Sequence, residues 1–175
     1  MAIRKQDIRK QNEAASVAHH EAGHGVIAYR LGLQTGRLTI EPDREAGTLG
    51  TSATESEWAD GSLDREQILV LYAGYAAEKH YDTDANAGDS YNDDEKAKRL
   101  LQFQPPETER ELRSTASELV AENWPAIEAV AAALLEHNTF NDDGWTIIID
   151  AIDEGDDWRE VLARYLALAP RQNAA

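Results

Sequence analysis

The chain of 175 residues contains no cysteine. This absence excludes disulfide bonds and also the thiolate ligands that hold many zinc ions. Any transition-metal site in this protein must therefore use histidine and carboxylate side chains. The sequence offers 5 His residues and 33 Asp and Glu residues for that purpose.

Basic residues are scarce as well. Only 17 Lys and Arg residues stand against the 33 acidic ones, which gives a net charge of −16. Nucleic acids and anionic membrane surfaces are bound by clusters of cations. We therefore expect neither of them as a partner.

No long hydrophobic run is present. The longest, residues 68–77, is about half of the roughly 20 residues that a membrane-spanning helix needs, and no apolar signal segment follows the N-terminus. We therefore expect a cytoplasmic protein. The length suits one domain with a sizeable core, which we place at residues 13–169, between a flexible basic N-terminus (1–12) and a frayed tail (170–175).

The most informative segment is His20-Glu21-Ala22-Gly23-His24, an HExxH motif. Two histidines four residues apart on a helix lie on one face and can bind one Zn²⁺, while the glutamate beside them is placed to take a proton from water. Both histidines fall on a stripe of apolar residues that is predicted to face the core, made of Val17, Ile27, Ala28 and Leu31.

An alternative is that His20 and His24 are core histidines without a metal. Each imidazole would then need its own polar partner, because an unpaired buried polar group costs roughly 1–3 kcal/mol. One shared metal satisfies both rings, so we favour metal binding. His19 points away from the stripe on the helical wheel and is expected to be exposed, as are His80 and His137.

Periodicity and turn residues predict a mainly α-helical protein with one small β-hairpin, an α+β fold. Gly23 lies in the middle of the first helix, where glycine costs about 1 kcal/mol relative to alanine, and it predicts the close approach of a neighbouring group. The hairpin is predicted at 37–41 and 47–53. The predicted helices are 13–31, ended by Gly32; 62–80, capped by Ser62; 91–103, ended by Pro105 and Pro106; 107–123; 125–136; 142–152; and 158–168.

A catalytic zinc site takes three protein ligands, so the motif requires one more from elsewhere. The candidates are Glu78 and the acidic cluster of Asp89, Asp93 and Asp94. On the predicted helix 91–103, Asp93 lies nearer than Asp94 to the centre of the apolar face. The carboxylate of Asp93 could instead simply stabilise the N-terminus of its helix. Glu78 could accept a hydrogen bond from a ligand histidine. The residues alone leave these alternatives open.

Five segments, in order and at similar spacing, resemble the peptidase domain of FtsH-type ATP-dependent zinc metalloproteases. The resemblance covers about residues 12–152 and is carried by Val17–His24, Leu38–Ile40, Gly47–Gly50, Leu71–Glu78 and Asn92–Ala97. It implies a zincin-like fold in which His20, His24 and Asp93 bind zinc and Glu21 is the catalytic base. The family's phosphate-binding loop, Gly-x-x-x-x-Gly-Lys-Ser/Thr, is absent from the sequence, so the resemblance is to the peptidase domain without its ATPase.

We therefore expect a zinc endopeptidase that cleaves unfolded or flexible polypeptide, alone, self-associated or together with a separate ATPase. One alternative is a non-catalytic module, derived from a peptidase fold, that binds a partner. Another is a different HExxH hydrolase in which Glu78 is the third ligand. Glu21 favours an enzyme over the module, because a structural zinc site does not need that carboxylate.

Overall fold

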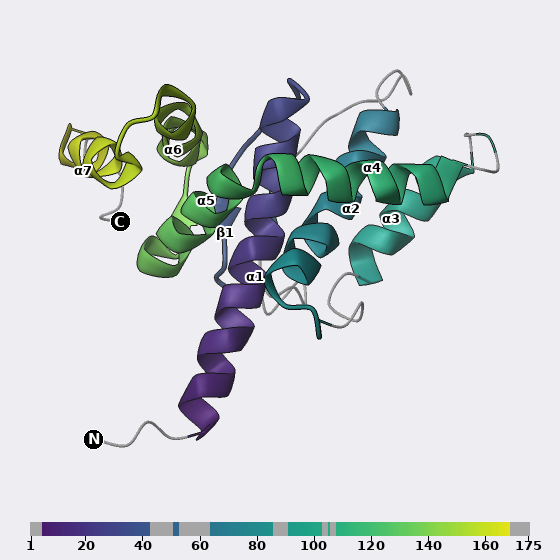
Figure 1. Ribbon diagram of the computed structural model, residues 1–175, viewed down its shortest axis with the longest axis horizontal. Helices are drawn as coiled ribbons and strands as arrows, with labels where there is room; N and C mark the ends of the chain where they lie inside the picture. The colour runs from purple at the N-terminus through teal and green to yellow at the C-terminus, as the bar shows by residue number, and fades with distance from the viewer. Residues whose placement is uncertain are drawn as a thin grey trace.

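The computed structural model describes residues 5–42, 51–52, 64–85, 91–102, 105 and 108–168. Within these segments the chain forms seven helices and three short strands (Figure 1). The helices are α1 (Lys5–Arg30), α2 (Asp64–Tyr81), α3 (Tyr91–Leu101), α4 (Thr108–Glu122), α5 (Trp124–His137), α6 (Asp142–Glu154) and α7 (Trp158–Leu168). The strands are β1 (Leu38–Thr39), β2 (Thr51–Ser52) and β3 (Thr139–Phe140).

Helix α1 runs through the middle of the molecule (Figure 1). It ends at Arg30, and Gly32 follows with a φ of +70°, the left-handed conformation that commonly terminates a helix. This end was predicted, but the start was not. The helix begins at Lys5 rather than Glu13, so residues 5–12, which we expected to form a flexible terminus, belong to α1.

The core forms where α1 packs between α2 and α5, while α2 also contacts α3 and α4. Helices α1 and α2 approach each other closely at Gly23. A methyl group on Gly23 would lie 2.7 Å from both the carbonyl oxygen of Ala73 and the Cβ of Ala77, which is too short for any real contact. The close approach predicted for this glycine is therefore confirmed, and it brings α2 against the HExxH face of α1.

The small sheet has the strand order β2-β1-β3 and is antiparallel throughout. The predicted pairing of the first two strands is confirmed, with Leu38 opposite Ser52; residues 43–50 between them lie outside the described residues. The third strand was not predicted. It pairs with β1 through Phe140 opposite Leu38, and two residues are too few to show the alternation that identifies a strand.

The remaining helices agree with the prediction to within about two residues, the usual uncertainty of helix ends. Pro125 lies in the first turn of α5, where its missing N–H costs nothing. The predicted N-cap Ser62 and the tail after residue 168 lie outside the described residues. Helices α6 and α7 lie at the opposite end of the molecule from α3 and α4 (Figure 1). Among the described helices, none has both the length and the hydropathy of a membrane span.

Candidate metal centre

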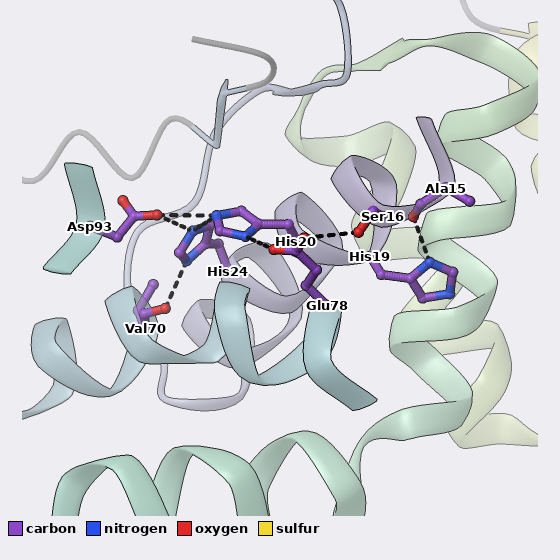
Figure 2. A network of polar contacts seen from close by, with 8 residues as sticks. All are labelled: Ala15, Ser16, His19, His20, His24, Val70, Glu78 and Asp93. Atoms are coloured by element: carbon purple, nitrogen blue, oxygen red, sulfur yellow. Dashed lines mark hydrogen bonds and ion pairs between the residues drawn. The ribbon is translucent and has the colours of Figure 1, made fainter. Parts of the chain in front are cut away.

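Three side chains from two helices converge beside α2 (Figure 2). His20 and His24 project from α1, with exposed fractions of 8% and 4%, and their Nε2 atoms are 3.0 Å apart. Asp93, in the first turn of α3, places Oδ2 at 3.1 Å from each of these two nitrogens. The structure thus brings together the three residues predicted to share a metal.

Hydrogen bonds at Nδ1 hold both imidazole rings in place. Nδ1 of His24 donates to the carbonyl oxygen of Val70 at 2.7 Å, and a carbonyl can only accept. Nδ1 of His20 lies 3.4 Å from Oε2 of Glu78, whose Oε1 accepts from the Ser16 hydroxyl at 2.9 Å. With its proton on Nδ1, each neutral ring keeps a lone pair on Nε2. This is the tautomer in which a histidine binds a metal through Nε2.

Three atoms, Nε2 of His20, Nε2 of His24 and Oδ2 of Asp93, are spaced as the ligands of a tetrahedral metal ion would be. Ligand atoms at about 2.0–2.1 Å from such an ion lie about 3.3–3.4 Å from one another, close to the 3.0–3.1 Å observed. Two imidazole lone pairs and a carboxylate oxygen repel one another at this distance unless a cation lies among them. Two nitrogens and one oxygen also form the three-ligand set of a catalytic site with an open fourth position.

Gly74 of α2 leaves space for the two rings. A methyl group on its Cα would come within 2.9 Å of Nε2 of His20 and closer still to Nε2 of His24. The rings and the backbone of α2 therefore already fill this side of the site. In the sequence Gly74 is one residue of the segment Leu71–Glu78, and the need for a residue without a side chain there follows from the structure.

The side chains of this cluster shift the pKa values of one another. Burial alone lowers the pKa of His20, but its hydrogen bonds with Asp93 and Glu78 outweigh burial and raise the pKa to about 10. Burial raises the pKa of Asp93, yet the positive charge of His24 and hydrogen bonds from His20 and His24 hold this pKa far below its ordinary value. Both shifts show that the site favours a positive charge between its ligands.

Glu21, the glutamate of the motif, does not join this cluster. It is only 6% exposed, and its Oε2 has no hydrogen-bond partner among the described residues. Burial raises the pKa of Glu21, although the nearby His24 and His20 oppose the shift. A buried carboxyl group with a raised pKa and an oxygen without a described partner, next to His20 in the chain, is placed to accept a proton.

The other candidate ligands have different partners. Asp94 is not one of the converging groups and receives a hydrogen bond of 3.1 Å from Arg113 of α4. Glu78 contacts Nδ1 of His20 and is not one of the converging groups. Asp89 lies outside the described residues. Of the alternatives left open by the sequence, the geometry favours Asp93.

We expected His19 to be exposed, and this expectation was wrong. The residue is buried, with 6% exposure. It turns away from the cluster (Figure 2), and its Nδ1 donates to the carbonyl of Ala15 at 2.8 Å. Its ring stacks on Tyr81 and Trp124, with centroids 4.0 and 5.4 Å away. The helical wheel assumed one buried face, whereas α2 and α5 both pack on α1. A signal was present in the apolar residues around His19, namely Ala15, Ala22 and Val26.

His80 and His137 are exposed, as expected. His80 packs against the ring of Trp124 and His137 against that of Phe140. Neither lies among the converging metal-ligand candidates. No protein-family model and no curated protein matches the chain, so the function has to be inferred from the site itself.

Proposed function

We propose that this protein is a zinc-dependent endopeptidase with an FtsH-like, zincin-type peptidase domain. The observation that carries the proposal is the orientation of the two imidazole rings. Hydrogen bonds at Nδ1 turn both Nε2 atoms toward Asp93, and Glu21 lies buried beside them without a partner for Oε2. Histidine and carboxylate ligands in a three-ligand set favour Zn²⁺ as the metal.

His20, His24 and Asp93 would hold the ion. Bound zinc would supply Lewis acidity, which polarises a peptide carbonyl and lowers the pKa of water to about 7. Glu21 would take a proton from the attacking water and pass it to the departing amine. Its raised pKa suits both steps, because a general base works best when its pKa lies near the working pH.

A polypeptide substrate is supported by the position of β2. It lies at one edge of the described sheet and contacts α1, the helix that carries the histidines. An extended peptide can add to such an edge by main-chain hydrogen bonds. A segment bound in this way must be unfolded or flexible, so a folded target would need a separate ATPase or another unfolding partner.

The test compares wild type with Glu21→Gln on casein and on an unstructured peptide library, substrates that need no ATP-driven unfolding. We expect wild type to cleave them, a chelator to abolish cleavage, and zinc to restore it. Glu21→Gln should bind zinc normally but lose activity by at least the roughly 10²–10⁴-fold that general base catalysis contributes. Glu13→Gln, an exposed change on the same helix, is the matched control.

Two results would contradict the proposal. Glu21→Gln cleaving as fast as wild type would remove Glu21 from the mechanism. A zinc-loaded wild type that cleaves nothing across the library would favour the other class of function, a non-catalytic module that uses this fold to bind a partner.

A further inference from the structure

Asp93 comes from a helix with few described connections to the rest of the protein. Helix α3 has 11 residues and packs on α2. Its one fully buried apolar side chain, Ala97, belongs to a core cluster with residues of α2 and α4, and the half-buried Leu100 and Leu101 pack against the same cluster. These apolar contacts begin at Ala97, one turn after Asp93. The first turn of α3, which carries Asp93, is held against the neighbouring helices by polar side chains.

Asp94, the residue after Asp93 in α3, is held by a contact of its own. Oδ1 of Asp94 accepts a hydrogen bond of 3.1 Å from Nη2 of Arg113, while Asp93 reaches the histidines of α1. Adjacent residues of an α-helix point about 100° apart. The two neighbouring carboxylates are thus held in different directions, one toward α1 and the other toward α4.

Arg113 is itself held in place by two further contacts. Its Nε donates to Oε1 of Glu109, one turn earlier on α4, at 3.0 Å. Its Cζ lies 4.0 Å from the centroid of the Tyr72 ring, a cation–π contact with α2. Helix α2 also carries Val70, Gly74 and Glu78, the residues around the imidazole rings. The guanidinium group therefore links the helix of the third ligand to the helix that orients the other two.

We infer that Arg113 is a positioning residue of the metal site and that, through Asp94, it holds Asp93 in line with His20 and His24. The inference rests on the proposed function, because it concerns the same zinc site. Arg113 touches none of the three ligands in the contacts described above, so its effect must pass through Asp94. The side chains of Arg113 and Asp94 are 36% and 28% exposed, which makes the pair too solvated to contribute much to overall stability.

The test is a double-mutant cycle on the full chain with Arg113→Met, Asp94→Asn and the two combined. Zinc affinity is measured by competition with a chelating dye, and the absorption spectrum of bound Co²⁺ reports the ligand geometry. We expect each single variant to bind zinc roughly 10–100-fold more weakly, as loss of an outer partner of a ligand does. The double variant should lose no more than the singles, because both changes break one interaction. The Co²⁺ spectrum should change in all three variants.

Arg110→Met is the matched control, since Arg110 is an exposed residue on the same helix, and it should bind both metals like wild type. The unfolding temperature of the metal-free variants should stay close to that of wild type, which separates positioning from general destabilisation. Asp94→Asn keeps the contacts of Arg113 with Tyr72 and Glu109, so it serves as the test if Arg113→Met does not fold.

Two patterns overturn the inference and leave the proposed function intact. One is wild-type zinc affinity and an unchanged Co²⁺ spectrum in Arg113→Met or Asp94→Asn. The other is a double variant whose loss equals the product of the two single losses, which would mean independent effects. A wild-type protein that binds no zinc would overturn the proposed function and this inference together.

Discussion

Gly74 on α2 lies directly against the ring of His24 on α1. The contact is so close that a methyl group on Gly74 would overlap the Nε2 atom of this ring, and it would reach 2.9 Å from Nε2 of His20. The α2 backbone therefore forms one wall of the space in which the imidazoles converge. Any side chain at position 74 has to displace one of these imidazole rings.

The first prediction concerns Gly74→Ala. In a helix this change ordinarily stabilises by roughly 0.5–1 kcal/mol. Here we expect the opposite for the metal site, because the rings must move out of line with Asp93. Zinc affinity, measured by competition with a chelator, should fall by more than the roughly 10–100-fold typical of an outer partner. Ala76→Ser, a half-buried change on the same helix, is the control. Unchanged zinc affinity in Gly74→Ala would show that the rings do not need this space.

The second prediction ranks the carboxylates. Asp93→Asn removes a proposed ligand charge and should weaken zinc binding most. Glu78→Gln changes the carboxylate that contacts Nδ1 of His20 and should weaken zinc binding roughly 10–100-fold. Glu95→Gln, also on α3 and bound to Lys98, should have no effect. Isothermal titration with zinc measures all three variants. If Glu78→Gln proved more damaging than Asp93→Asn, the third ligand would be Glu78.

The third prediction separates His19 from its neighbour His20. His19→Ala should lower the free energy of unfolding of the metal-free protein by about 1–3 kcal/mol, the usual range for losing a packed buried side chain, because its stacking on Tyr81 and Trp124 is lost. Zinc affinity should stay at the wild-type level. Chemical denaturation and zinc titration give the two numbers. A large loss of zinc affinity here would place His19 in the metal site after all.

The sequence predicted the helices well, and it named His20, His24 and Asp93, which converge in the structure. The spacing of His20 and His24 fixes their common face on any helix, and Asp93 lies on the apolar side of α3. What the sequence missed depends on packing between distant segments. The burial of His19 follows from α2 and α5 covering α1 together. The pairing of Phe140 with Leu38 and the hydrogen bond from His24 to the backbone of Val70 have no local signature in the chain.

The fourth prediction is a pH dependence of the metal-free protein. The pKa of His20 is raised from 6.5 to about 10, since the hydrogen bonds with Asp93 and Glu78 outweigh burial. A group whose pKa is raised by folding stabilises the folded state fully below its ordinary pKa and loses that contribution as pH rises toward the new value. The free energy of unfolding of chelator-treated protein should therefore fall from pH 6.5 to pH 9.5. His20→Gln should flatten this slope. A wild-type slope that persists unchanged in His20→Gln would assign the effect to other groups.

The last prediction is that Glu21→Gln stabilises the metal-free protein while it abolishes turnover. Burial raises the pKa of Glu21, so above that pKa the folded state holds a carboxylate whose Oε2 has no partner among the described residues. A neutral amide of nearly the same shape removes the cost of burying a charge, and the gain should be about 1.4 kcal/mol for each unit by which folding raises the pKa of Glu21. The sign follows from linkage: a raised carboxyl pKa lowers stability as pH rises, so the gain should appear at pH 8 and vanish near pH 4.

Chemical denaturation of chelator-treated wild type and Glu21→Gln at these two pH values measures the difference. Glu13→Gln controls for the loss of one negative charge from α1, and we expect no gain from it, since Glu13 is exposed. If Glu21→Gln were less stable than wild type at pH 8, Glu21 would be a structural member of the core, and its role as a destabilised, reactive base would be lost.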